Sequence, residues 1–214
     1  MSAVATCLPI TTGSASYAII HSTQHSLVMA MVIRDKLYTA EEFWEIARLP
    51  ENEGRRLELD EGVIVEMAAS SPTNTVIAAR MIYHLSAFVI PRDLGYVTAP
   101  DGGFKLAPRT TRQPDAAFIS NKRISALPHE FEIAPDLAVE VVSPNEDIFK
   151  KAGEYLRAGT KFVWGIYADE KTVYVFRLSE DGKVIADPKR INDTLDGEDV
   201  LPGFQLAVKD IFPE

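Results

Sequence analysis

The stretch at residues 134–155 constrains the fold more than any other part of the chain. Residues 137–142 read LAVEVV, an apolar and β-branched run that is ended by Pro144, so we expect a buried strand. Glu140 lies in the middle of this run. An ionised carboxylate in a dry interior is unfavourable unless positive charge meets it, so Glu140 calls for a metal ion or a basic side chain nearby.

The residues that follow Pro144 indicate a helix that carries charged groups. Asp147, Lys150 and Lys151 fall within it, and Gly159 is a natural end for it. A strand that presents a carboxylate and continues into a helix that presents lysines is a plausible site for metal and phosphate chemistry.

The remaining segments alternate between helical and strand patterns. Residues 37–48 show capping-box spacing from Thr39 to Glu42 and an apolar side, which predicts a short amphipathic helix. A hairpin over 55–67 and a core helix over 73–90 follow. Further strands are expected at 95–99, 104–107, 116–120, 162–167 and 172–178 and near Val184, before a final segment at 201–212. This order predicts one α/β (α+β) domain with a mixed or largely antiparallel central sheet.

A second carboxylate, Asp115, begins the strand predicted at 116–120 and is the candidate partner of Glu140. A hairpin or short crossover between the two strands would bring both side chains within reach of one ion. Mg²⁺ commonly takes one or two protein carboxylates and keeps water and phosphate oxygens as its other ligands. Asp136 competes with Asp115, but it precedes Glu140 by four residues on one strand, which places it roughly 13 Å away.

Composition limits the classes of partner. The chain has 214 residues and a net charge of −9, which argues against broad attraction to nucleic acid or anionic membrane but permits an acidic site neutralised by metal. Cys7 is the only cysteine, which fits a reducing, cytoplasmic location. No segment of the sequence is long and apolar enough to suggest a membrane span.

The N-terminal residues differ from the rest in composition. Residues 1–30 are rich in Ser, Thr and Ala and lack the basic start and apolar core of a secretory signal. We therefore expect residues 1–36 to be a weakly structured extension and residues 37–214 to form a single domain. Met29 or Met31 is an alternative natural start.

Several short motifs occur in a fixed order between residues 38 and 212. They are RLELDEG at 56–62, QPD at 113–115, EVVSP at 140–144, the Lys-Tyr-Gly spacing at 151, 155 and 159, Trp164, and LPGF at 201–204. Together they resemble the Uma family of restriction endonucleases (DUF820), within the PD-(D/E)xK nuclease superfamily. The resemblance implies a restriction-endonuclease-like fold, a site dependent on Mg²⁺ or Mn²⁺ that hydrolyses phosphodiesters of nucleic acid, DNA in particular, and a homodimer.

The resemblance also assigns roles to individual residues. Asp115 matches the first metal ligand of the family, Glu140 the second, and Glu58 an upstream acidic residue that joins the site. The superfamily lysine is expected two residues after Glu140, where this chain has Val142; in this family the lysine comes instead from the following helix, where Lys151 matches. The long side chain has only to bring a point charge to the phosphate or the water.

Two positions depart from the family pattern. Asn74 stands where the family often has a histidine, and Phe162 and Val163 replace an acidic-aromatic pair before Trp164. Both departures bear on the surroundings of the site more than on its carboxylate pair.

Each candidate also has a purely structural interpretation. Glu140 could pair with an internal arginine, Asp115 could be a turn residue after Pro114, and Glu58 could be an exposed strand residue. Lys151 could form a helical ion pair with Asp147, with Lys150 as the substitute in the site. Arg109 and Arg112 are interpreted as solvated loop charges, with contact to phosphate as the alternative. Tyr155 is interpreted as packing, and His84 as a helix-face residue without a ligand role.

Three functions fit these observations. The first is a metal-dependent nuclease in which Asp115, Glu140 and Glu58 bind the metal and Lys151 serves catalysis. The second is a non-catalytic dimeric module that binds nucleic acid or regulates, retaining the nuclease fold; the missing lysine at Val142 and the acidic charge favour it. The third is hydrolysis of another phosphoester, because two carboxylates and a lysine do not distinguish between DNA, RNA and a nucleotide as substrate.

Overall fold

The computed structural model describes residues 36–144 and 146–214. It divides at Leu37 into two units, and the fold described here is that of the second unit, Tyr38–Glu214. The extension predicted for residues 1–36 lies, apart from Lys36, outside the described residues. Within the described residues, no helix is long and apolar enough to cross a bilayer.

Three helices and twelve strands make up this unit. The helices are α1 (Ala40–Ala47), α2 (Pro72–Val89) and α3 (Ile148–Arg157), with 3-10 turns η1 (Pro50–Asn52), η2 (Ile90–Arg92) and η3 (Val208–Asp210). The strands are β1 (Leu57–Asp60), β2 (Val63–Glu66), β3 (Gly95–Thr98), β4 (Phe104–Ala107), β5 (Thr110–Arg112), β6 (Ala116–Ser120), β7 (Leu137–Val141), β8 (Phe162–Tyr167), β9 (Thr172–Leu178), β10 (Val184–Lys189), β11 (Thr194–Asp196) and β12 (Gln205–Ala207).

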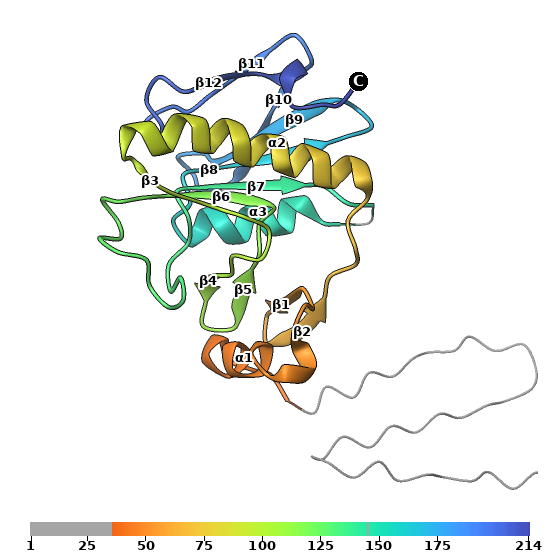
Figure 1. The fold of residues 1–214 in the computed structure, drawn as a ribbon, viewed down its shortest axis with the longest axis vertical. Coiled ribbons are helices and arrows are strands. Elements are labelled where there is room, and N and C mark those ends of the chain that lie inside the picture. Colours follow the sequence, from red (N-terminus) through yellow and green to blue (C-terminus); the bar gives the residue numbers. More distant parts are fainter. Residues whose placement is uncertain (1–35, 145) are drawn as a thin grey trace, which may run out of the picture. The chain divides into compact units, whose positions relative to one another are not determined.

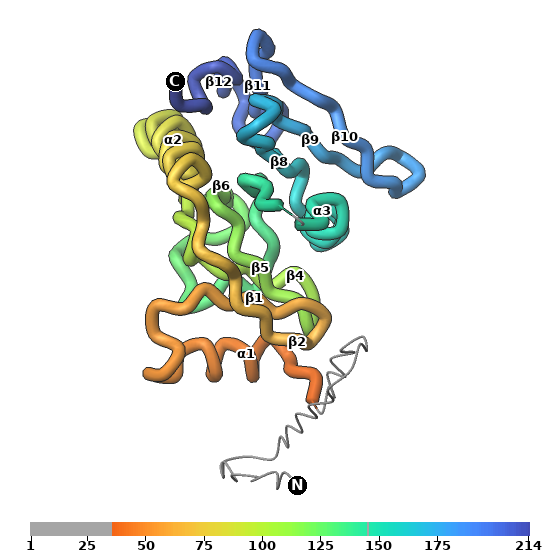
Figure 2. Tube along the Cα trace, turned by 90° about the vertical axis from the view of Figure 1, so that its right-hand side faces the viewer, coloured from red at the N-terminus to blue at the C-terminus, as the bar shows by residue number. Residues whose placement is uncertain are grey.

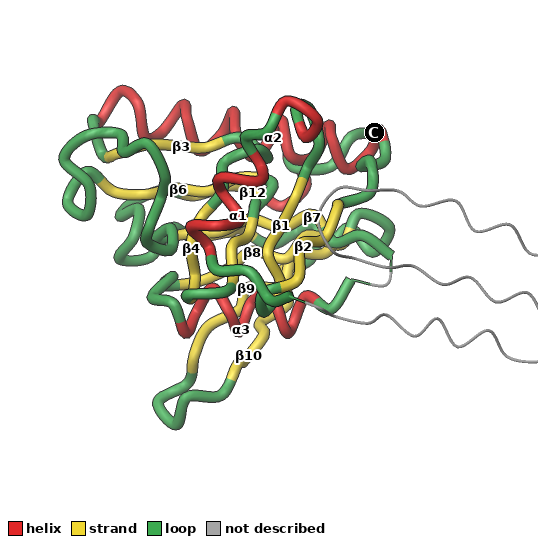
Figure 3. Tube along the Cα trace, turned by 90° about the horizontal axis from the view of Figure 1, so that it is seen from below, coloured by secondary structure: helices red, strands yellow, loops and turns green. Residues whose placement is uncertain are grey.

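A six-stranded sheet in the order β10-β9-β8-β7-β6-β3 forms the centre of the unit. Every neighbouring pair is antiparallel except β7 and β8, which run parallel because α3 crosses between them. The predicted mixed sheet flanked by helices is confirmed: α2 covers one face and α3 the other, as Figures 1 and 2 show. Figure 3 shows the strands lying between the two helices when the unit is seen from below.

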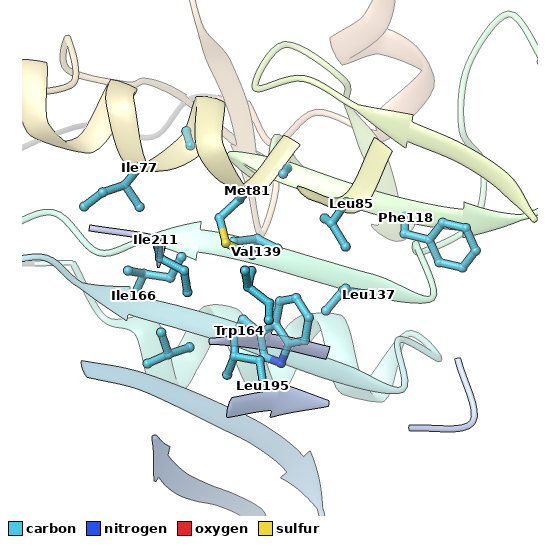
Figure 4. Close-up of a cluster of buried hydrophobic side chains, with 14 of the residues drawn as sticks. Ile77, Met81, Leu85, Phe118, Leu137, Val139, Trp164, Ile166, Leu195 and Ile211 are labelled. Carbon is cyan, nitrogen blue, oxygen red and sulfur yellow. The ribbon is translucent and has the colours of Figure 1, made fainter. Parts of the chain in front are cut away.

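Strand β7 alternates between these two faces. Leu137, Val139 and Val141 belong to the core under α2, where Val139 lies beside Met81 of the helix (Figure 4). Ala138 belongs to the separate core under α3. Because side chains alternate along a strand, Glu140 shares the α3 face with Ala138. The alternation thus directs the mid-strand carboxylate toward the helix that carries Lys151.

A second sheet, in the order β2-β1-β5-β4, packs its apolar side against α1. Helix α1 has the predicted capping box, in which the Thr39 hydroxyl accepts from the Glu42 N–H and the Glu42 carboxylate accepts from the Thr39 N–H. The predicted hairpin joins β1 to β2 and turns at Glu61 and Gly62. This sheet positions Glu58, and β5 leads through residues 113–115 into β6 of the central sheet.

Gly165 allows close packing beside Glu140. Gly165 of β8 pairs with Glu140 in the parallel register, and a Cβ atom there would lie 2.7 Å from the Phe176 ring and 3.2 Å from the Ile148 side chain. The missing side chain allows the start of α3 to lie against the sheet next to the carboxylate.

Candidate active site

Glu140 lies at the centre of the candidate site and is 3% exposed. Its Oε1 accepts a 2.8 Å hydrogen bond from the Tyr155 hydroxyl, and its Oε2 lies 3.6 Å from Lys151 Nζ. Burial raises the pKa of Glu140 to about 8, although the positive charge of Lys151 opposes the rise. The negative charges of Glu58 and Asp115 act in the same direction as burial. Glu140 is therefore a carboxylate short of positive charge.

Asp115 reaches the same region from the neighbouring strand. Ala116 pairs with Val139 in the antiparallel register, so Asp115 stands opposite Glu140. Its Oδ2 accepts a 2.8 Å hydrogen bond from the Val141 N–H, and its Oδ1 lies 3.7 Å from Arg56 Nη2. Burial raises the pKa of Asp115, while the bond from Val141 and the charge of Arg56 oppose it.

Glu58 comes from the second sheet and is almost fully buried. Its Oε1 accepts from the Gln113 N–H at 3.0 Å and lies 3.4 Å from Lys151 Nζ, while its Oε2 accepts from Arg112 Nη1 at 3.1 Å. The interpretation of Glu58 as an exposed strand residue is thus wrong. Its contacts link the second sheet to α3.

Lys151 is buried among three carboxylates. Its Nζ lies 2.7 Å from Glu146, 3.4 Å from Glu58 and 3.6 Å from Glu140. Burial by itself lowers the pKa of Lys151, but the charges of Glu140, Glu58 and Glu146 outweigh it and raise the pKa. Lys151 therefore stays protonated at neutral pH.

The structure distinguishes Lys151 from the alternatives that the sequence left open. Asp147 caps α3 by accepting from the Lys150 N–H. Lys151 forms its ion pair with Glu146 instead of the expected one with Asp147. Lys150 donates to Asp60 at 2.7 Å and is partly exposed. Lys151, and not Lys150, contacts Glu140.

Tyr155 does more than pack. It lies one helical turn after Lys151, on the same face of α3, and its hydroxyl binds Glu140. Burial, together with the negative charges of Glu140 and Glu58, raises the pKa of the phenol. Tyr155 therefore acts as a hydrogen-bond donor that holds Glu140 in place.

The interpretation of Arg112 as a solvated loop charge is wrong. It is buried on β5 and binds Glu154 at 2.7 Å, Asp60 at 2.9 Å and Glu58 at 3.1 Å. Burial lowers the pKa of Arg112, but these carboxylates outweigh that effect and raise it. One feature of the sequence could have indicated this role. Glu58 and Asp60 lie two residues apart, so their carboxylates share one side of a strand, where a single cation can pair with both.

The remaining carboxylate, Asp136, lies at the other end of β7. It accepts from the Ser120 N–H at 2.8 Å and pairs with Arg123. It takes no part in the cluster around Glu140.

The carboxylates of the site fit a divalent cation by their chemistry. Asp115 and Glu140 offer oxygen ligands from adjacent strands, which Mg²⁺ and Mn²⁺ prefer. Burial raises the pKa of both carboxyl groups, and a cation bound between them would favour their ionised forms. Within the described residues, no three His, Cys, Asp or Glu side chains are already gathered as a metal cluster. The pair therefore suits an ion that completes its shell with water and phosphate oxygens.

The mixed sheet with one helix on each face is a restriction-endonuclease-like fold. The family model Uma2, described as "Putative restriction endonuclease", matches residues 40–209, so the chain belongs to this family. A crystal structure described as "a putative nuclease belonging to DUF820 from Anabaena variabilis" matches with a TM-score of 0.68 and 23% identity, over 82% of this chain and 97% of that chain. The comparison with curated proteins gave no match.

Proposed function

We propose that the protein is a metal-dependent endonuclease that hydrolyses phosphodiester bonds of nucleic acid, with DNA as the expected substrate. One observation carries the proposal. Glu58, Glu140 and Lys151 come from three elements separated by up to 93 residues, yet their charged groups meet in one buried cluster beside Asp115. Buried charges with perturbed pKa values are typical of catalytic sites.

In this proposal Asp115 and Glu140 hold the metal, and Glu58 completes the ligand set. A bound Mg²⁺ or Mn²⁺ would supply positive charge for the phosphate oxygens and favour deprotonation of the attacking water. The protonated Lys151 donates to the phosphate or orients the water, which stabilises the charge that grows in the transition state. Tyr155 fixes the orientation of Glu140, and Arg112 holds Glu58.

The test combines metal binding with cleavage. Calorimetry with Mg²⁺ and Mn²⁺, without and with a DNA duplex, is expected to show binding by the wild type and none by the Asp115→Asn, Glu140→Gln double variant. Cleavage of labelled nucleic acid should disappear in the same variant. Asp136→Asn is the matched control, because it neutralises a buried aspartate at the other end of the same strand. Metal-dependent cleavage that persists in the double variant would reject the assignment.

A non-catalytic module that binds nucleic acid or regulates is the second candidate. The observation that favours it is the saturation of Lys151, which already contacts three carboxylates and has no obvious capacity for a phosphate in this state. Nucleic-acid binding that requires no divalent ion and leads to no cleavage would support this candidate against the enzyme.

The proposal includes a homodimer and a cytoplasmic location. The dimer is supported by the family resemblance, and light scattering of the full chain at several concentrations tests it. A mass equal to one chain at all concentrations would contradict it.

A further inference from the structure

A pocket of about 360 Å³ adjoins the candidate active site on the side of α2. Its lining includes Arg56, Asn74, Ala78, Ala79, Ile82 and Asp115. Asp115 thus borders both the carboxylate cluster and this pocket, so a group bound in the pocket would lie next to one of the candidate metal ligands. The volume lies near the lower end of the range for ligand pockets, ~300–1,000 Å³. It suits one small flat group.

The walls of the pocket are mostly apolar. Two consecutive alanines of α2, Ala78 and Ala79, leave the space open, and Ile82 and Pro100 add apolar surface. Ala78 is buried and Ala79 is exposed. Among the described residues, no aromatic ring lines this pocket.

Arg56 supplies the positive charge at the Asp115 end. Its Nη1 reaches Ser70 Oγ and its Nη2 reaches the Pro100 carbonyl, both at 3.4 Å, which is long for a hydrogen bond. Its Nε is buried and has no hydrogen-bond partner in the described part of the chain. Because Nε is enclosed by the protein, a ligand in the pocket would meet the guanidinium through Nη1 and Nη2, whose contacts, including the 3.7 Å approach of Nη2 to Asp115, are long and leave capacity for an anionic ligand.

Asn74 adds a group that can recognise a ligand. No hydrogen bond of its side-chain amide is found among the described residues, although its backbone N–H binds Ser71. The amide offers both donors and an acceptor, the combination that pairs with the edge of a nucleobase. The apolar walls can hold the faces of a nucleobase, and the Asn74 amide can bind the edge of that base. The Arg56 guanidinium at the end of the pocket can bind the phosphate of the same nucleotide.

We infer that this pocket binds one unstacked nucleotide of the substrate strand next to the bond that is cut, with Arg56 on its phosphate and Asn74 on its base. The inference rests on the proposed nuclease function and names the form of its substrate. A pocket of this size does not admit a base pair, so a paired base must first leave its stack, which is unfavourable. The protein should therefore prefer single-stranded or mismatched nucleic acid to a perfect duplex.

The experiment measures binding without cleavage. Fluorescence anisotropy of a labelled single strand, and of its perfect duplex, is recorded with Ca²⁺ in place of Mg²⁺, and gels verify that the strands stay intact. Ala79→Phe fills the pocket with a ring, while Ala87→Phe places the same ring at an exposed position two turns further along α2. We expect Ala79→Phe to weaken single-strand binding about tenfold, the scale of one lost base contact. Ala87→Phe should leave the dissociation constant unchanged within a factor of about two, as expected for a surface substitution outside the pocket.

A second variant protects the test against misfolding. Thermal melting checks that both phenylalanine variants fold, and Asn74→Ala, which removes only an amide, should reduce the differences in affinity among the four homopolymer strands. Equal single-strand binding by Ala79→Phe and Ala87→Phe, in a protein that cuts nucleic acid, overturns the inference and leaves the proposed function standing. A wild type that neither binds nor cuts either substrate overturns both.

Discussion

Lys151 Nζ lies 3.4 Å from Glu58 Oε1, although 93 residues separate them in the chain. This contact joins α3, which covers the central sheet, to β1 of the second sheet. It brings Glu58 into the cluster formed by Glu140 and Lys151. The cluster contains more carboxylates than cations, so the fold holds negatively charged side chains close together although they repel one another. Such an arrangement is unfavourable for stability and suits a site that binds a cation.

Replacing Glu140 with glutamine should abolish metal binding without reducing stability. The amide oxygen of the introduced side chain still accepts from the Tyr155 hydroxyl, and Lys151 retains Glu58 and Glu146. Below about pH 8 the amide replaces a protonated carboxyl, and above that pH a buried charge is removed. We expect a melting temperature equal to or above that of the metal-free wild type, measured by differential scanning calorimetry in EDTA. A strongly lowered melting temperature would mean that Glu140 is a structural ion-pair partner.

Lys151→Met should remove cleavage and also destabilise the fold. Without the lysine, Glu58, Glu140 and Glu146 lose their shared cation, and breaking a buried pair typically costs about 3–5 kcal/mol. Urea unfolding in EDTA measures this loss, and labelled nucleic acid measures the activity. Lys150→Met is the matched control, because its partly exposed pair with Asp60 is worth no more than about 1 kcal/mol. Equal activity of the two variants would show that Lys151 is not the catalytic lysine.

The main elements could be predicted because their patterns are local. The LAVEVV run gives β7, the capping box at Thr39 gives α1, and Ala116–Ser120 coincides with β6. The contacts of Arg112 could not be predicted, because they depend on how the two sheets meet. The same holds for Glu146, which binds Lys151 from a loop with no periodic pattern. Ion-pair partners are set by three-dimensional packing, which periodicity does not contain.

Arg112→Lys should destabilise the protein even though it keeps the charge. The guanidinium binds Glu58, Asp60 and Glu154 through three different nitrogens, and a single ammonium cannot reproduce that fork. A loss of about 3–5 kcal/mol is expected in urea unfolding, as for a broken buried network. The exposed Arg109→Lys serves as control and should stay within about 0.5 kcal/mol. If Arg112→Lys matched it, the two sheets would not depend on this network.

The affinity for Mg²⁺ should rise with pH and level off near pH 8. Burial raises the pKa of Glu140 from its ordinary 4.5 to about 8, so below that pH a proton competes with the metal for the carboxylate.

The same rise in the pKa of Glu140 makes the free energy of unfolding depend on pH. The metal-free folded state binds a proton that the unfolded state has released, so the contribution of Glu140 to stability is present below pH 4.5 and is lost as the pH rises to about 8. Calorimetric titrations and urea unfolding between about pH 5 and pH 9, compared with Glu140→Gln, isolate both effects. A wild type whose metal affinity stays constant over this range would show that Glu140 is already ionised at the lower end, with its burial offset by the contacts of Lys151 and Tyr155.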